Sequence, residues 1–144
     1  MEALQPYVQA LAKKGFSVRV FESAAQVRDA LLDLIPDGAS VGFGGSMTIE
    51  TLGVYDVLAR RGNPVYWHWK NPPQARAQVT KDAFCADYYL MSANAIGADA
   101  TLWNIDGNGN RLATMVGGRG KLIVVAGVNK CVPKGEDPVA RIKR

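Results

Sequence analysis

The stretch Trp103–Arg111 (W-N-I-D-G-N-G-N-R) holds the densest group of side chains in this chain that could bind a ligand or do chemistry. The pair Asp106-Gly107 is enough by itself for a type I′ hairpin turn, because both residue types accept positive φ values. Asn104, Asn110 and Arg111 are then left over, and they supply amide donors, amide acceptors and one permanent positive charge. Such a set suits a small anionic or polyhydroxylated ligand. A hairpin with extra polar side chains is the alternative.

A glycine-rich segment, Gly42–Thr48, offers a second set of binding groups between a predicted strand and a predicted helix. Gly44 and Gly45 can present backbone N–H groups, and Ser46 and Thr48 add hydroxyls beside a helix N-terminus, which is how proteins hold phosphates and carboxylates. The segment has neither the Walker A sequence nor the spacing of a dinucleotide fingerprint. The alternative is a tight turn in which Ser46 only caps the helix.

Three charged residues are the candidates for acid–base chemistry: Glu50, Asp106 and Lys130. Glu50 falls in the first turn of the helix after the glycine-rich segment. There it either acts as a base or nucleophile or only complements the helix dipole. Lys130 and Asn129 follow an apolar strand, and they either contact the ligand or are solvated.

Asn94 and Asp99 are weaker ligand-binding candidates, because either side chain could instead stabilise the backbone of its loop. His68 is the single histidine, and the sequence favours a structural or surface role for it. Cys85 and Cys131 have no metal-binding spacing, so no metal site is expected, and the sequence identifies no cofactor.

Strands separated by helices predict an α/β fold: a Rossmann-like, three-layer domain with a mostly parallel central sheet. The whole chain, 1–144, is expected to be one domain. Helices are predicted at 2–14, at 23–34 with a Ser23–Gln26 capping box, at 48–60, from a cap at Asn71, and near 137–138; strands are predicted at 16–21, 40–43, 65–69, 88–92, 101–105 and 122–126, and 112–116 is ambiguous. The apolar run 122–126 predicts a central strand covered on both faces.

Several of the polar candidates directly follow predicted strands. Ligands of such sheets bind beyond the carboxyl ends of the strands. Gly44–Ser46, Asn94 and Gly127–Lys130 are therefore expected to converge on one edge of the sheet.

The net charge of +4 comes largely from the C-terminal segment. Five basic and two acidic residues lie from Lys130 onward, which leaves 12 basic and 11 acidic residues before it. A basic stripe interleaved with aromatic residues is missing, so no nucleic-acid partner is expected. Neither a signal peptide nor a membrane-spanning run is present in the sequence, which favours a cytoplasmic protein with no membrane partner.

Four ordered motifs resemble the lactate-utilisation (LUD) domain family: G-F-G-G-S-M-T-I-E at 42–50, S-A-N-A-I at 92–96, W-N-I-D-G-N-G-N-R at 103–111 and V-V-A-G-V-N-K at 124–130. The resemblance runs from about Val8 to Arg144. It implies the fold of ribose-5-phosphate isomerase, glucosamine-6-phosphate deaminase and the CoA transferases. Family motif positions fall on Gly44, Gly45, Ser46, Thr48, Glu50, Asn94, Asn104, Asp106, Gly109, Asn110, Arg111, Asn129 and Lys130.

Two features depart from the family pattern. Ala100 stands where relatives often have Gly, which puts the shape of the 97–101 turn in doubt. The Cys-rich tail of longer relatives has no counterpart here, which puts any redox role that relies on it in doubt.

The resemblance implies one of two functions. The first is a LUD-domain protein of lactate or organic-acid metabolism that binds a small anion, such as a lactate-like acid, a sugar phosphate or a CoA ester. The second is a non-catalytic subunit or regulator of an iron–sulfur-dependent L-lactate oxidation complex, whose other subunits would be its partners. The sequence leaves open whether the protein is an enzyme and whether it forms a homodimer.

Overall fold

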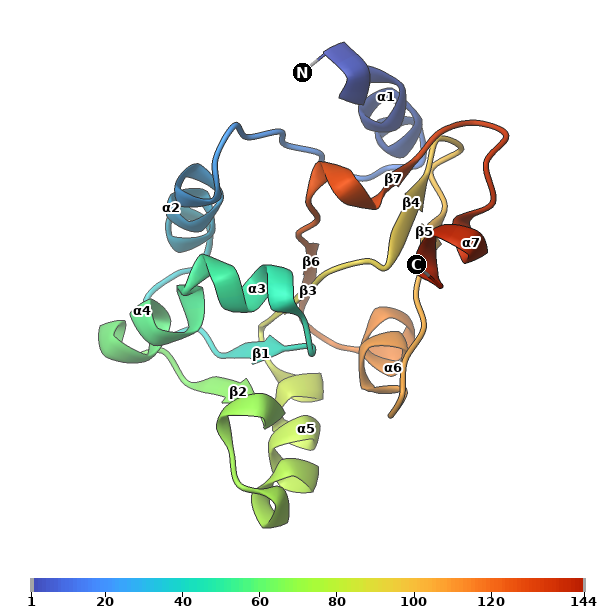
Figure 1. The fold of residues 1–144 in the computed structure, drawn as a ribbon. Helices are drawn as coiled ribbons and strands as arrows, with labels where there is room; N and C mark the ends of the chain where they lie inside the picture. The colour runs from blue at the N-terminus through green and yellow to red at the C-terminus, as the bar shows by residue number, and fades with distance from the viewer. Residues whose placement is uncertain (1, 144) are drawn as a thin grey trace. The chain divides into compact units, whose positions relative to one another are not determined.

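Four parallel strands form the larger of two sheets in the computed structural model, which describes residues 2–143 (Figure 1). They are β1 (Val41–Phe43), β2 (Val65–Trp67), β3 (Tyr88–Met91) and β6 (Lys121–Val124), in the order β2-β1-β3-β6. Val41 pairs with Val65 on one side and with Tyr88 on the other. The parallel order requires a crossover segment between successive strands, and helices supply it.

The chain divides into two compact units. The first comprises Met1–Glu22, Ala93–Ile105 and Ala126–Arg144, and the second comprises Ser23–Ser92 and Asp106–Val125. The four-stranded sheet belongs to the second unit.

Both faces of this sheet are buried within the second unit. Along β3, Tyr88 and Leu90 join one apolar cluster, whereas Tyr89 and Met91 join another. Successive side chains of a strand point to opposite faces, so the two clusters lie on opposite sides of the sheet. The second unit therefore has three layers, which confirms the predicted α/β fold with a mostly parallel sheet.

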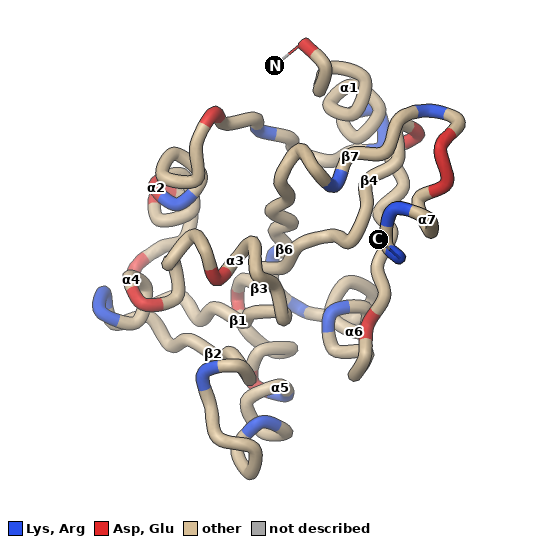
Figure 2. The backbone as a smooth tube through the Cα atoms, viewed as in Figure 1, with Lys and Arg blue, Asp and Glu red and all other residues tan. Residues whose placement is uncertain are grey.

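The helices divide between the two faces. The first cluster contains residues of α2 (Ala24–Leu34), α3 (Met47–Leu52) and α4 (Val54–Arg61); the second contains residues of α5 (Arg76–Cys85) and α6 (Asn110–Gly117). The capping box that begins α2 is present: Gln26 N donates to Ser23 Oγ at 3.3 Å, and Ser23 N donates to Gln26 Oε1 at 3.2 Å. Basic and acidic residues both occur in α2 and in α4, so neither helix carries charges of only one sign (Figure 2).

The first unit contains a small three-stranded sheet. β4 (Ala95–Gly97) lies between β5 (Leu102–Trp103), which is antiparallel to it, and β7 (Cys131–Val132), which is parallel to it. The unit also contains α1 (Gln5–Lys13), the 3₁₀ turns η1 (Glu2–Leu4) and η4 (Val128–Lys130), and α7 (Pro138–Ile142). The helix predicted near 137–138 is thus present, and its N-cap Asp137 accepts from Val139 N at 2.9 Å. The sequence did not reveal β4 or β7. Arg144, the last residue of the basic segment, lies outside the described residues.

Two strand predictions are wrong. Phe16–Phe21 alternates as a strand would, but its backbone joins neither sheet, and Phe16, Val20 and Phe21 are exposed. Alternation favours an extended chain, whereas a strand also needs a hydrogen-bonded neighbour. The run Leu122–Ala126 was expected at the centre of the sheet, but β6 is an edge strand that pairs only with β3, and Leu122 is 36% exposed.

Three boundaries differ from the sequence-based expectation. The helix predicted over 48–60 is interrupted at Gly53, which has a φ of 65° and separates α3 from α4. The strand predicted over 65–69 ends at Trp67, and a 3₁₀ turn, η2 (His68–Lys70), follows. Asn71 caps no helix, because its amide donates to Trp67 O at 2.7 Å; the turn η3 (Pro73–Ala75) precedes α5.

The ambiguous segment 112–116 is helical and belongs to α6. None of the helices within residues 2–143 is long and apolar enough to cross a membrane.

We expect Gly42→Ala to destabilise the protein by about 2 kcal/mol or more, because overpacking of this kind strains the backbone. A Cβ at Gly42 would lie 2.4 Å from the carbonyl oxygen of Ala83 in α5, and a backbone atom cannot rotate away. Urea unfolding measures the change. Gly117→Ala is the matched control, since its nearest neighbour would be Phe84 at an ordinary 3.4 Å. Equal stability of the two variants would contradict the close approach of α5 to β1.

Candidate functional site

The predicted ligand-binding loop connects β1 to α3 in the second unit. Gly44 N donates to Leu90 O at 2.9 Å, so this amide continues the sheet. Ser46 is buried, and its Oγ accepts from Ile49 N at 3.3 Å, which makes it the N-cap of α3. The capping role considered for Ser46 is therefore present, and Thr48 is half-buried in the first turn of α3.

Glu50 forms an ion pair that the sequence did not suggest. Lys70 Nζ lies 2.6 Å from Glu50 Oε1, and this hydrogen bond raises the pKa of Lys70. The ammonium also lies 5.5 Å from the ring centroid of Trp67 and 5.9 Å from that of Tyr55. Glu50 thus has a structural partner in η2, and a catalytic role for it stays a prediction.

Asp106 and Arg111 form a buried ion pair at the start of α6. Arg111 Nε donates to Asp106 Oδ1 at 2.6 Å, and the two side chains are 10% and 5% exposed, respectively. Asp106 Oδ2 accepts from Leu112 N at 2.9 Å. The carboxylate therefore neutralises the guanidinium and also satisfies a backbone N–H in the first turn of the helix.

The type I′ turn predicted at Asp106-Gly107 is wrong. Neither residue has a positive φ; within this motif the left-handed conformation belongs to Gly109, the N-cap of α6, at 72°. The segment leads into a helix and not into the next strand of a hairpin. Its polar side chains are used in starting that helix, which is why they exceed what a turn requires.

The glycine-rich loop packs directly on this ion pair. A Cβ at Gly44 would lie 2.7 Å from Arg111 Cγ and 3.2 Å from Met91 Cβ. Two sequence motifs, 42–50 and 103–111, are thereby in contact within the second unit. The contact involves the aliphatic part of Arg111, while its guanidinium is held by Asp106.

Tyr89 lies close to the same pair from β3. Its pKa is raised to about 12, chiefly by burial, with a smaller opposing effect from its hydrogen bond with Thr114. Thr114 Oγ1 in turn donates to Asn110 O at 2.8 Å. The phenol is neutral at physiological pH and acts as a hydrogen-bonding group beneath α6.

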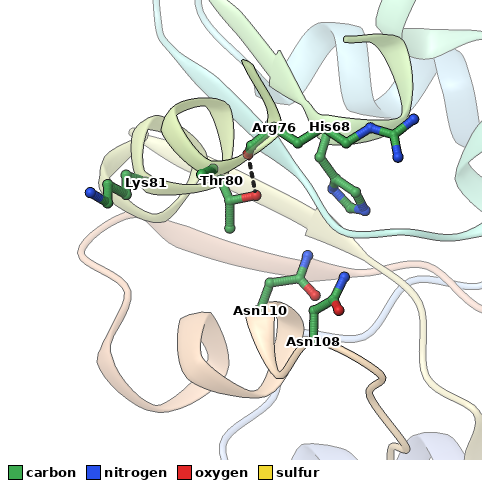
Figure 3. A pocket seen from close by; sticks show the side chains of 7 residues that line it. His68, Arg76, Thr80, Lys81, Asn108 and Asn110 are labelled. Carbon is green, nitrogen blue, oxygen red and sulfur yellow. Dashed lines mark hydrogen bonds between the residues drawn. The ribbon is translucent and has the colours of Figure 1, made fainter. Parts of the chain in front are cut away.

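A pocket of about 440 Å³ lies between η2, α5 and the start of α6 in the second unit (Figure 3). Its lining residues are His68, Arg76, Ala77, Thr80, Lys81, Asn108 and Asn110. The imidazole of His68 and the amides of Asn108 and Asn110 face the same space, and Arg76 and Lys81 extend outward from α5 in different directions (Figure 3). Thr80 Oγ1 donates to Arg76 O at 2.8 Å.

The place of the pocket in the fold favours anions. His68 directly follows β2, so the pocket lies beyond the carboxyl end of that strand, where ligands of parallel sheets bind. Its wall includes Arg76 and Asn110, the first residues of α5 and α6. Helix N-termini carry partial positive charge, and two cationic side chains add to it.

His68 is half-buried, and its pKa is lowered. Burial is the largest cause, the nearby charge of Arg76 acts in the same direction, and Asp106 opposes them. Near neutral pH the imidazole is therefore uncharged. One of its nitrogens can donate a hydrogen bond, and the other can accept one.

The remaining predicted residues belong to the first unit. Asn94 Oδ1 accepts from Ile105 N at 3.1 Å, and Asn94 N donates to Trp103 O at 3.0 Å, so Asn94 joins the ends of β4 and β5. Asp99 Oδ1 accepts from Thr101 Oγ1 at 2.6 Å, and this hydrogen bond is the main cause of the lowered pKa of Asp99. Asp99 Oδ1 also accepts from Thr101 N at 3.2 Å, so both side chains bind loop backbone, and ligand binding by either stays a prediction.

The 97–101 turn contains Ala100 at a φ of 64°, a left-handed conformation that favours glycine. The turn therefore has the backbone shape that a glycine would adopt, although Ala occupies it. Elsewhere in the first unit, Asn104 follows β5, and Asn129 and Lys130 lie in η4, where Asn129 O accepts from Arg141 Nε at 2.9 Å.

Comparison with protein families decides what kind of protein this is. The family model of the LUD domain matches residues 4–144, nearly the whole chain. The chain belongs to the LUD domain family. A search of curated proteins and a search of solved structures each found no match.

The structure brings together only part of the site expected for a LUD domain. Gly44, Gly45, Ser46, Thr48, Glu50, Asp106, Asn110 and Arg111 lie in the second unit, whereas Asn94, Asp99, Asn104, Asn129 and Lys130 lie in the first. The convergence of the two sets on one sheet edge stays a prediction. Of all these residues, Asn110 alone is among those that line the pocket.

Sequence reasoning missed most of the pocket of this LUD domain. Arg76, Thr80, Lys81 and Asn108 were not candidates, and His68 was assigned a structural or surface role. Their signal was positional: each lies just after β2, in the first turns of α5 or just before α6. A search for polar residues after the edge strand would have found His68 and Arg76.

We expect Asp106→Ala to destabilise the LUD domain by about 3 kcal/mol or more, because it leaves the Arg111 guanidinium buried without its carboxylate. Asp29→Ala removes the carboxylate of the exposed Arg28–Asp29 pair, and it should cost less than about 1 kcal/mol. Urea unfolding of both variants measures the difference. Similar losses for the two would mean that the Asp106–Arg111 pair is not buried.

We expect the stability of the LUD domain to decrease in acid partly because of His68. A histidine whose pKa is lowered by folding stabilises the native state above its unfolded pKa of about 6.5, and that contribution is lost as the pH falls through the folded value. His68→Gln should therefore lose less stability than the wild type between about pH 7.5 and about pH 5. Urea midpoints at both pH values measure this. Identical pH dependence of stability in the two proteins would mean that folding does not lower the pKa of His68.

Proposed function

We propose that this LUD-domain protein serves lactate or organic-acid utilisation by binding a small organic anion in the pocket between α5 and α6. The observation that carries the proposal is the composition of the pocket wall: two cationic side chains of α5, two amides at the start of α6 and the neutral imidazole of His68 in η2. These groups suit a carboxylate or phosphate whose remaining oxygens accept hydrogen bonds.

The amides of Asn108 and Asn110 would bind such an anion together with the two terminal NH₂ groups of Arg76, whose Nε already donates to Asn71 O at 3.1 Å. A guanidinium binds a carboxylate or phosphate through two parallel hydrogen bonds. The amides can donate to hydroxyl or carbonyl oxygens next to the acid group, as in a 2-hydroxy or 2-keto acid. The buried Asp106–Arg111 pair would hold the start of α6, and with it Asn108 and Asn110, in position.

His68 is the group in the pocket wall best suited to proton transfer. As a neutral imidazole it can accept a proton from a ligand hydroxyl or donate a hydrogen bond to a carbonyl oxygen. Glu50 and Asp106 are held in ion pairs, and Lys130 belongs to the other unit. A reaction in this pocket would therefore use His68 as its acid or base, and not one of the three residues predicted from the sequence.

A second function, a subunit of a lactate-oxidising complex, is favoured by exposed apolar side chains. In the second unit Leu112 and Leu122 are 40% and 36% exposed, and Val116 is 91% exposed. Apolar surface of this kind is common where proteins associate. The anion pocket remains the better-supported proposal, because its wall combines cationic side chains, amides and an imidazole around one pocket.

We expect Arg76→Gln to weaken binding of a small organic anion about tenfold or more, the usual effect of losing one charge-assisted pair. A thermal-shift screen of L-lactate, pyruvate, glycolate and sugar phosphates finds the anion, and calorimetry measures its affinity. A ligand at 100 times its dissociation constant stabilises by about 2.7 kcal/mol, which is easily detected.

Lys130→Ala is the informative companion variant, because the sequence assigned ligand binding to Lys130. Affinity lost in Arg76→Gln and kept in Lys130→Ala supports the pocket. Affinity kept in Arg76→Gln and lost in Lys130→Ala would place the anion site at residues of the first unit. That result would overturn the proposal that the pocket binds the anion. A folded protein that binds none of these anions would favour the subunit function.

A further inference from the structure

Three aromatic rings form a column that runs from the core of the second unit to its surface. The centroids of Phe43 and Trp67 lie 5.2 Å apart with an interplanar angle of 18°, and those of Trp67 and Trp69 lie 5.5 Å apart at 16°. Phe43 is 1% exposed and Trp67 is 0% exposed, whereas Trp69 is 43% exposed. The column of nearly parallel planes therefore ends at an indole that is open to solvent.

No further ring of residues 2–143 stacks in parallel on Trp69. Its other aromatic neighbour is His68, whose ring meets it edge-on, with centroids 6.2 Å apart and an interplanar angle of 70°. Aromatic pairs favour offset-stacked arrangements, and a planar ligand can supply the next layer. A large indole held flat by the ring beneath it is a rigid stacking surface.

Gly45 brings bare backbone close to this indole. A Cβ at position 45 would lie 3.0 Å from Cζ2 of Trp69 and 3.1 Å from both Cε2 and Nε1. The φ of Gly45 is not positive, so the backbone does not require glycine there. The glycine-rich loop, which the sequence assigned to anion binding, thus contributes a bare backbone against Trp69.

Trp69 and the anion pocket are consecutive features of the same turn, η2. His68 lines the pocket, and the next residue is the exposed indole. The imidazole of His68 thus lines the pocket with the cationic side chains and amides, and it also meets the indole of Trp69 edge-on. This order matches a molecule with an acidic group at one end and a planar ring at the other.

We propose that the pocket ligand is a nucleoside phosphate whose base stacks on Trp69 and whose phosphate is held by the pocket, a proposal that rests on the anion-binding function above. Every nucleobase has a flat face that stacks on an aromatic side chain, and the ribose separates that base from the phosphate. A small acid such as lactate would leave Trp69 unused. A protein partner on Trp69 would use the indole but not the amides and cations of the pocket.

Calorimetry with AMP and ribose 5-phosphate tests the proposal, because the two probes share the sugar and the phosphate and differ in the base. Stacking of one base predicts about tenfold tighter binding of AMP. Trp69→Leu should remove that advantage and leave the affinity for ribose 5-phosphate unchanged. Trp69→Phe should restore most of it, since a phenyl ring keeps an aromatic face.

Trp103→Leu is the matched control, because Trp103 is similarly exposed, at 38%, but lies in β5 of the first unit. It should change neither affinity, and urea midpoints show that each variant is folded. Equal affinity for AMP and ribose 5-phosphate would overturn the proposed stacking on Trp69, and so would an equal loss of both affinities in Trp69→Leu. Neither result would contradict anion binding in the pocket. Binding of neither probe, together with no effect of Arg76→Gln on any anion, would overturn both proposals.

Discussion

The buried ion pair between Asp106 and Arg111 is the interaction on which the second unit of this LUD domain depends. Desolvating two charges is costly, so such a pair persists only when its geometry is good and its other hydrogen-bonding groups are satisfied. Here Asp106 also accepts from a backbone N–H of α6, and the stem of Arg111 packs under Gly44. One pair therefore fixes the start of a helix and the path of the loop that leaves β1. The amides of Asn108 and Asn110 at the start of α6 and the loop against Trp69 both depend on this pair, and both belong to the proposed ligand site.

The fold follows from patterns that are local in sequence. The capping box at Ser23 and the apolar spacing after it specify α2 without help from distant residues. The apolar residues of β3 are buried on both faces, as a parallel sheet between two helical layers requires. Strand patterns were less informative, because a strand also needs a neighbouring strand that is distant in the sequence. Phe16–Phe21 alternates without joining a sheet, and the apolar run at Leu122 was taken for a central strand although β6 lies at the edge.

The candidate site was predicted in part, for a physical reason. The motifs 42–50 and 103–111 are unusual in residue type, so the sequence alone marked them, and the contact between Gly44 and Arg111 shows that they meet. Their internal roles could not be read, because Asp106-Gly107 has the composition of a turn whether it ends a hairpin or starts a helix. The pocket was missed because Arg76 and Lys81 are ordinary residues on a helix surface. They acquire significance only from the position of α5 beside the start of α6.

The interleaving of the two units has a consequence for how the protein is made. The strands β1, β2 and β3 and the helices between them are encoded within one continuous segment, Ser23–Ser92, whereas α6 and β6 arrive later, after residues of the first unit. Synthesis proceeds from the N-terminus at about 5–20 residues per second, so the residues of β1, β2 and β3 are all made before those of the fourth strand. Until then the outer edge of β3 has unpaired backbone groups, and Tyr89 and Met91 lack the cover of α6. That edge and that face can therefore be covered only once the chain has been synthesised through β6.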